Sequence, residues 1–336
     1  MPSQLSQIRR LISSLPRTSL ISLPTPLNRV DRMSAELGLD LWIKRDDLTG
    51  IGCGGNKLRK LEFIVAQARE NGIDTLLTTG GAQSNHARLT AAVAARLGMS
   101  CELYLNAEPI SAREGNLLLD TLFGAAIHFC GITDYSVIND RMASRVEELE
   151  RAGHKALAVP LGGATGPGTL GYVVAFAELH EQLAAMGRNG PLTVVVSGGT
   201  GSTAAGLLVG AALLAPQTRL LVVSASWDED KLKHAIRSCA LEASQVLGVA
   251  APAADRLIVS DRHVGPGYAQ TSEEGIAAVL RVARSEGILL DTTYTGKAMS
   301  GLIASAECGT LNSDGPTVFL HTGGTPDVFT RRWPVR

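Results

Sequence analysis

Lys57 has the most suggestive position for chemistry, because it follows two glycines and an asparagine where a helical pattern begins. Glycine tolerates positive φ, so Gly54 and Gly55 can form a tight turn, and Asn56 is a good N-cap. The apolar residues that follow repeat at helical spacing and predict a helix over 57–71. A lysine in the first turn lies beside the positive end of the helix dipole, which depresses its pKa. Such an amine is suited to forming an imine at neutral pH.

The alternative is an ordinary surface lysine. Arg59 and Lys60 follow in the same turn, and most lysines are solvated. The rest of the chain has to decide between an imine-forming lysine and a basic surface turn.

Alternating strand and helix patterns predict how these residues are positioned. The strands are continuous apolar runs, which is typical of parallel sheets buried on both faces. Residues 1–27 are rich in Ser and Pro, and the prolines argue against a long helix there. We expect helices at 28–37, 57–71, 84–98, 113–122, 135–152, 168–186, 202–213, 229–246, 272–286 and 295–307, and strands at 39–48, 75–80, 101–106, 126–131, 155–160, 192–198, 219–226, 256–260, 288–291 and 317–324.

Composition limits the class of protein. The 336 residues correspond to about two domains at the usual size. A net charge of −1 offers no electrostatic footprint for nucleic acid or for an anionic membrane. The five cysteines are odd in number and form no CxxC pair, which favours a reduced compartment. We find no apolar run long enough to span a bilayer and no secretory signal, so the expected location is the cytoplasm.

Gly80–His86 joins a predicted strand to a predicted helix, and ligands gather at such junctions in parallel sheets. Backbone N–H groups, the Ser84 hydroxyl and the Asn85 amide would face one spot there and could cradle a carboxylate. The simpler interpretation is that Ser84 only caps the helix.

A second glycine-rich junction, Ser197–Thr203, has the layout of a phosphate-binding nest between strand and helix. It lacks the lysine of a P-loop, so a monophosphate suits it better than a nucleoside triphosphate. Close packing alone is the alternative.

A third stretch, Gly166–Gly171, spells GxGxxG, but the acidic residue expected about 20 positions later in a dinucleotide site is absent. We therefore expect it to serve packing. Tyr268 and Tyr294 lie in tight turns, where tyrosines more often pack than react, and Thr322 ends the last strand. The histidines show no metal-ligand spacing, and no GxSxG elbow is present.

Five segments together resemble the D-cysteine desulfhydrase and 1-aminocyclopropane-1-carboxylate deaminase family, which uses pyridoxal phosphate. They are GGNKLRKLEF, GGAQSNHAR, SGGTGST, YTGKAMSGLI and HTGGTP, and the likeness runs from about residue 20 to residue 330. It implies a tryptophan-synthase-β-like fold (fold type II), an α/β architecture with two open parallel-sheet, three-layer domains. It also implies a large domain of residues 1–59 and 166–336, a small domain of residues 60–165 inserted in it, and a homodimer.

The resemblance also implies roles for individual residues. Lys57 would form the Schiff base with the cofactor and accept the Cα proton. Asn85 would bind the cofactor's phenolic oxygen, and Thr322 would face its ring nitrogen. The remaining roles would be phosphate binding by Ser197, Gly198, Gly199, Thr200, Gly201, Ser202 and Thr203, substrate binding by Gln83, Ser84, Asn85, His86 and Tyr294, and catalysis by Ser84, Tyr268 and Tyr294 beside Lys57.

Thr295 bears on the substrate. Deaminases of the family resemble one another in having Glu after the second tyrosine. Desulfhydrases resemble this chain in having Thr at that position, which is Thr295 here. The resemblance therefore favours α,β-elimination of D-cysteine to pyruvate, ammonia and sulfide. The open alternatives are cyclopropane ring opening, a lyase for another β-substituted amino acid such as cysteate, a silent cofactor carrier, and, from a different class, a nicotinamide-dependent oxidoreductase using Gly166–Gly171.

Overall fold

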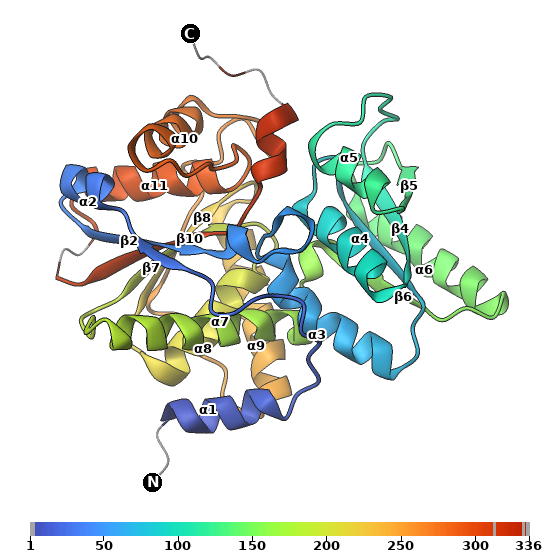
Figure 1. The fold of residues 1–336 in the computed structure, drawn as a ribbon, viewed down its shortest axis with the longest axis horizontal. Coiled ribbons are helices and arrows are strands. Elements are labelled where there is room, and N and C mark those ends of the chain that lie inside the picture. The colour runs from blue at the N-terminus through green and yellow to red at the C-terminus, as the bar shows by residue number, and fades with distance from the viewer. Residues whose placement is uncertain (1–3, 312–313, 331–332, 334–336) are drawn as a thin grey trace.

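The computed structural model describes residues 4–311, 314–330 and 333, which form two lobes (Figure 1). The larger lobe is built on a six-stranded sheet, and every neighbouring pair in it is parallel except β1 with β2. In spatial order its strands are β1 (Leu27–Arg29), β2 (Asp40–Arg45), β10 (Pro316–His321), β7 (Thr193–Gly198), β8 (Arg219–Ser224) and β9 (Leu257–Ser260).

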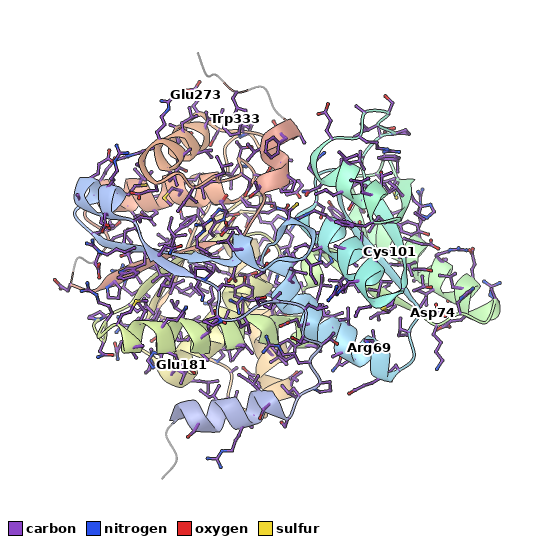
Figure 2. All side chains as sticks on the ribbon, viewed as in Figure 1. Arg69, Asp74, Cys101, Glu181, Glu273 and Trp333 are labelled. Atoms are coloured by element: carbon purple, nitrogen blue, oxygen red, sulfur yellow. The ribbon has the colours of Figure 1, made fainter. Side chains whose placement is uncertain are left out.

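Two layers of helices cover the large sheet. One face packs against α7 (Gly166–Ala185), α8 (Ser202–Leu214) and α9 (Glu229–Leu247). The other face packs against α2 (Asp31–Leu37), α10 (Glu273–Glu286) and α11 (Thr295–Glu307). Figure 2 shows Glu181 on α7 and Glu273 on α10 at opposite sides of this three-layer lobe.

The smaller lobe repeats this plan around a parallel four-stranded sheet. Its strands, in spatial order, are β5 (Ala126–Phe129), β4 (Ser100–Asn106), β3 (Thr75–Gly81) and β6 (Ala156–Val159). One face packs on α3 (Lys57–Glu70), α4 (Asn85–Leu97) and α5 (Gly115–Leu122), and the other on α6 (Tyr135–Arg151).

Helix α3 joins the two lobes. Its Phe63 belongs to the apolar core of the large lobe, whereas Leu58 and Leu61 belong to that of the small lobe. Residues in the first turn of α3 therefore lie where the two lobes meet.

The predicted α/β class and its three-layer parallel sheets are confirmed, and ten predicted helices lie within a few residues of observed ones. Two expectations are wrong. The expected strand at 288–291 forms no ladder, and β2 ends at Arg45, where a 3-10 helix (Asp46–Leu48) begins. The Ser- and Pro-rich start contains a short helix, α1 (Gln4–Ser13), which ends before Pro16. The two sheets do not by themselves fix domain boundaries at 60 and 165, which stay a prediction. Among the described residues, no helix has both the length and the apolar character needed to cross a membrane.

Candidate active site

A cavity of about 350 Å³ lies between the two lobes. Strand ends and helix N-termini from both lobes converge on it, as the fold class predicts. The lining residues are Asn56, Lys57, Lys60, Ser84, Asn85, His86, Asn106, Tyr135, Leu161, Gly162, Ser197, Gly198, Gly199, Thr200, Gly201, Thr203, Ala204, Ser226, Trp227, Tyr268, Tyr294 and Thr322.

Lys57 lines this cavity from the first residue of α3. Its Nζ donates a hydrogen bond to the carbonyl oxygen of Gly162 at 3.3 Å. Burial lowers the pKa of Lys57 to about 8. Loss of solvation is the main cause of this lowering. An amine with this pKa is partly neutral near physiological pH, as nucleophilic chemistry requires.

Asn56 does not cap α3 with its side chain, contrary to the sequence-based expectation. Its Nδ2 instead donates to Thr203 Oγ1 at 3.0 Å, and its backbone N–H donates to Thr322 O at 3.0 Å. Asn56 thus ties the lysine turn to the loop after β7 and to the end of β10.

Arg59 and Lys60 do not form a basic surface turn, since each is 1% exposed. Lys60 Nζ donates to Ser202 Oγ at 2.6 Å and to Gly162 O at 3.2 Å. Burial, together with the nearby charge of Lys57, lowers the pKa of Lys60 well below its ordinary value. Two lysines therefore share one polar cavity wall.

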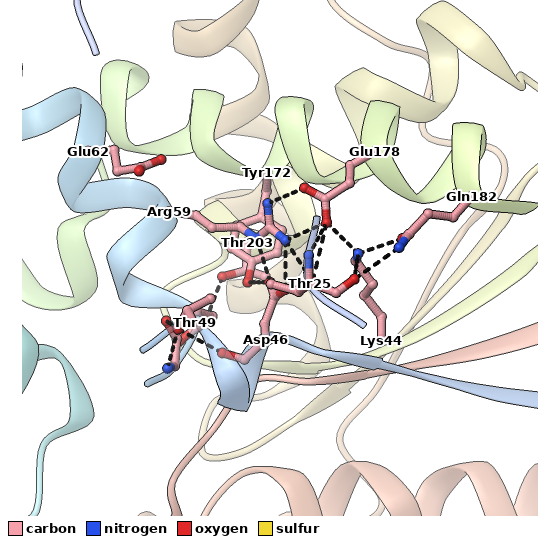
Figure 3. A network of polar contacts seen from close by, with 12 residues as sticks. Thr25, Lys44, Asp46, Thr49, Arg59, Glu62, Tyr172, Glu178, Gln182 and Thr203 are labelled. Atoms are coloured by element: carbon pink, nitrogen blue, oxygen red, sulfur yellow. Dashed lines mark hydrogen bonds and ion pairs between the residues drawn. The ribbon is translucent and has the colours of Figure 1, made fainter. Parts of the chain in front are cut away.

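Arg59 does not line the cavity and instead belongs to a buried ionic network (Figure 3). Its guanidinium donates to both carboxylate oxygens of Asp46 at 2.8 Å and to Glu178 at 3.0 and 3.1 Å. Glu178 also pairs with Lys44, and the Tyr172 hydroxyl donates to Asp46 at 2.6 Å. These bonds fix the start of α3 against α7 and the 3-10 helix that follows β2, and so fix Lys57.

The loop Ser197–Thr203 surrounds the far wall of the cavity. Gly201 has φ +87° and precedes α8, so the N-terminus of that helix is directed at the cavity. Ser197 Oγ and Thr200 Oγ1 are buried with no hydrogen-bond partner among the described residues. A Cβ at Gly162 (φ +70°) would collide with Thr200 Oγ1. Unpaired hydroxyls beside a helix N-terminus are suited to an anion.

The turn after β3 supplies the opposite wall. Ser84 Oγ accepts a hydrogen bond from Ala87 N at 3.2 Å, so Ser84 caps α4 and also lines the cavity. Asn85 Oδ1 accepts from Asn116 Nδ2 at 2.9 Å and from Arg88 at 3.4 Å. The capping role and the lining role of Ser84 therefore coexist.

His86 is 2% exposed and meets Thr78 Oγ1 at 2.9 Å through its Nε2 atom. Its Nδ1 has no partner among the described residues. Burial and the charges of Lys57 and Lys60 lower the pKa of His86 well below its ordinary value. His86 is therefore neutral at pH 7 and lines the cavity as an uncharged imidazole.

Tyr268 and Tyr294 meet at the cavity, with 2.8 Å between their hydroxyl oxygens. Although 38% of Tyr268 is exposed, its hydroxyl end is enclosed, and this burial raises its pKa to about 12. Burial also raises the pKa of Tyr294 well above its ordinary value. The Tyr294 turn is held by Asp291, whose Oδ1 accepts from the backbone N–H groups of Thr293 (2.8 Å) and Tyr294 (2.6 Å).

Two of the predicted site residues, Gln83 and Ser202, do not line the cavity. Thr322 does line it, directly after the end of β10. Gln83 does not line it, because its side chain bonds Asn116 N (2.7 Å) and Glu114 O (3.1 Å). Ser202 does not line it either, because its hydroxyl is covered by Lys60.

The GxGxxG stretch serves packing. Gly168 and Gly171 lie in α7, where a Cβ would collide with the backbone at Gly163 and Arg59 respectively. Neither glycine lines the cavity. The structure thus favours the packing interpretation over a dinucleotide site.

Sequence reasoning missed several lining residues. Asn106 ends β4, a position that could have been inferred from the strand-end rule. The same rule covers Trp227, which follows β8, whereas Tyr135 begins α6 with no such signal; neither lies in a glycine-rich turn. Lys60 was not predicted as a lining residue, because lysine side chains are usually exposed to solvent.

The chain is similar to known proteins over nearly its whole length. The family model described as "Pyridoxal-phosphate dependent enzyme" matches residues 18–323. The chain belongs to this family. Its fold is that of fold type II pyridoxal-phosphate enzymes, and pyridoxal phosphate is its cofactor.

Two relatives carry the name D-cysteine desulfhydrase. The protein of Yersinia enterocolitica is 41% identical over 96% of this chain and 98% of its own length. That of Klebsiella pneumoniae is 41% identical over 95% of this chain and 97% of its own. A crystal structure described as an ACC deaminase homologue superposes with a TM-score of 0.89 at 34% identity, covering 98% of this chain and 97% of the other.

Proposed function

We propose that this enzyme catalyses α,β-elimination of D-cysteine, giving pyruvate, ammonia and hydrogen sulfide with consumption of one water. The observation that carries the proposal is the lysine of lowered pKa facing unpaired loop hydroxyls across one cavity. The names of the relatives supply the substrate.

The loop Ser197–Thr203 fits the cofactor's phosphate. Ser197 Oγ and Thr200 Oγ1 would each gain the partner they lack, and the N-terminus of α8 favours the dianion. Lys60, whose Nζ donates to the Ser202 hydroxyl, adds a hydrogen-bond donor behind the loop. This donor set is sized for a monophosphate.

Asn85 and Thr322 would hold the two ends of the ring, the phenolic oxygen and the ring nitrogen. Both line the cavity. A threonine hydroxyl is neutral, so it does not enforce protonation of the ring nitrogen as a carboxylate would.

Lys57 would bind the cofactor covalently and, once released by the substrate amine, take the Cα proton. When bound, pyridoxal phosphate supplies an electron sink for the carbanion at Cα. The lowered pKa of Lys57 suits it to accept a proton near neutral pH. Its position on the first turn of a helix anchored on both sides keeps its Nζ over one point of the cavity.

The remaining walls would bind and orient the substrate. Ser84, Asn85 and the backbone N–H groups of their turn would receive the substrate carboxylate, with neutral His86 behind them. Tyr268 and Tyr294 have raised pKa values, so both are protonated at pH 7. Their hydroxyls, which are hydrogen-bonded to each other, would line the cavity beside the substrate's side chain and provide a proton donor at its sulfur.

Aminocyclopropane carboxylate deamination is the second candidate, favoured by the crystal structure described as an ACC deaminase homologue. Thr295 weighs against it. The Thr295 hydroxyl donates to Asp291 Oδ2 at 2.7 Å and is 0% exposed, so it offers the cavity no carboxylate. If residue 295 influences which substrate is accepted, it does so indirectly, by positioning the turn that carries Tyr294.

A panel of D-cysteine, L-cysteine, D-cysteate and aminocyclopropane carboxylate tests the substrate. We expect pyruvate and sulfide in equal amounts from D-cysteine, with the other compounds slower. Release of 2-oxobutyrate from aminocyclopropane carboxylate, with no sulfide from D-cysteine, would reverse the assignment.

We also propose a cytoplasmic homodimer with domains of residues 1–59 and 166–336 and of residues 60–165. Five free cysteines among the described residues support a reducing location. The family resemblance supports the dimer, and sedimentation equilibrium would check it.

A further inference from the structure

Asn116 is a buried residue outside the cavity that contacts the turn forming one cavity wall. It lies in the first turn of α5 and is 0% exposed. Its Nδ2 donates to Gln83 O at 2.8 Å and to Asn85 Oδ1 at 2.9 Å, while its backbone N–H donates to Gln83 Oε1 at 2.7 Å. Three bonds from one residue thus hold the chain at Gln83 and Asn85.

These bonds determine which way the Asn85 amide faces. Arginine can only donate, so the 3.4 Å contact from Arg88 requires that the Asn85 atom facing it is the oxygen. Asn116 Nδ2 donates to the same oxygen. The NH₂ group of Asn85 is left for the cavity, which Asn85 lines. A donor is the group needed there for an ionised ring oxygen.

The orientation of Asn116 is fixed in turn by a backbone carbonyl. Gln83 O can only accept, so the Asn116 atom that faces it must be the nitrogen. Asn116 Oδ1 is buried and has no partner among the described residues. A side chain at position 116 that can only accept hydrogen bonds would therefore face two other acceptors, Gln83 O and Asn85 Oδ1, with no proton between them.

The first turn of α5 also contacts the large lobe. A Cβ on Gly115, which has φ +52°, would meet Thr330 Cγ2 and Pro326 O of the 3-10 helix Thr325–Thr330. Asn116 therefore lies where this C-terminal segment meets the small lobe.

We propose that Asn116 is a positioning residue, which holds the Asn85 amide with its NH₂ group towards the phenolic oxygen of bound pyridoxal phosphate. The proposal rests on the cofactor placement described above and not on the identity of the amino-acid substrate.

Asn116→Asp tests the proposal, because it keeps the shape of the side chain and removes both donors. We expect the apoprotein to bind pyridoxal phosphate at least about tenfold more weakly in an equilibrium titration, the loss of one oriented hydrogen bond. The visible absorbance of the bound cofactor changes with pH, and we expect the midpoint of that change to move to a higher pH in this variant. Thr121→Val is the matched control, since the Thr121 hydroxyl bonds Leu117 O within α5, and it should change neither quantity.

A double-mutant cycle separates positioning from general loosening. In an Asn85→Ala background, Asn116→Asp should weaken cofactor binding less than twofold. Asn116→Ser should reproduce the effect of Asn116→Asp, and it replaces that variant if circular dichroism shows misfolding. Wild-type cofactor affinity and absorbance in folded Asn116 variants would overturn the proposal, as would an undiminished effect in the Asn85→Ala background. Because these readouts need no substrate, they hold even if D-cysteine proves to be the wrong amino acid.

Discussion

The first turn of α3 separates two polar regions of opposite character. On one side, Arg59 lies among charged groups that are all paired, Asp46 and Glu178 with Arg59 and Lys44 (Figure 3). On the other side, Lys57 faces a cavity whose hydroxyls at Ser197 and Thr200 have no partner in the described part of the chain. Both regions are buried and polar, but only the first is satisfied by the protein itself.

The difference indicates what each region does. A satisfied buried network fixes backbone positions, and removing one partner leaves an uncompensated charge. A wall of unsatisfied groups costs stability until a ligand supplies the missing partners. Residues two positions apart in one helix thus serve the scaffold and the chemistry respectively.

Lys57→Met should have the largest effect on the cavity side. We expect turnover to fall about 10³-fold or more, since the nucleophile and the proton acceptor are lost together. Pyruvate formation with cofactor in excess measures it. Activity within tenfold of wild type would remove Lys57 from the mechanism.

Arg59→Met should have the largest effect on the scaffold side. We expect the free energy of unfolding to fall by about 3 to 5 kcal/mol, because Asp46 and Glu178 stay buried without their main partner. Urea denaturation of the apoprotein measures it. Arg281→Met is the control: this arginine is 30% exposed and pairs with Glu36, which is 49% exposed, so its loss should cost less than about 1 kcal/mol.

The lowered pKa of Lys57 predicts how apoprotein stability depends on pH. The unfolded lysine binds a proton more tightly than the folded one, so the folded state gains stability as pH rises from about 8 towards the ordinary lysine value. Lys57→Met should therefore be more stable than wild type by about 1 to 3 kcal/mol at pH 7, with the gap closing at higher pH. Parallel pH profiles of the two proteins would contradict the lowered pKa.

Thr200→Val should have the smallest effect, with opposite signs in the two states. Removing a buried hydroxyl that lacks a partner should stabilise the apoprotein by about 1 kcal/mol. The same change should weaken cofactor binding by about tenfold, because one phosphate donor is lost. Melting temperatures with and without pyridoxal phosphate would show both. A variant less stable than wild type without cofactor would mean that Thr200 is already satisfied.

Much of the site was predictable because it follows local rules. Glycine-rich loops after apolar strands mark Asn85 and Thr200, and a turn before a helix marks Lys57. Each signal is contained within a few consecutive residues. The alternation of strands and helices predicted the layers for the same reason.

The scaffold side could not be predicted, because its partners are far apart in sequence. Arg59 pairs with Asp46 and Glu178, which lie 13 and 119 residues away. Asn116 likewise contacts Gln83 and Asn85 from 31 to 33 residues away. Such pairings depend on how α3, α5 and α7 pack, and no short pattern records that packing.

Borohydride reduction of the cofactor-loaded enzyme, followed by peptide mapping, tests the central claim most directly. Lys57 and Lys60 both line the cavity, both have lowered pKa values and both donate to Gly162 O. The account predicts that the reduced cofactor is attached to Lys57 alone, with Lys60 unmodified. Attachment to Lys60, or no covalent attachment at all, would contradict it.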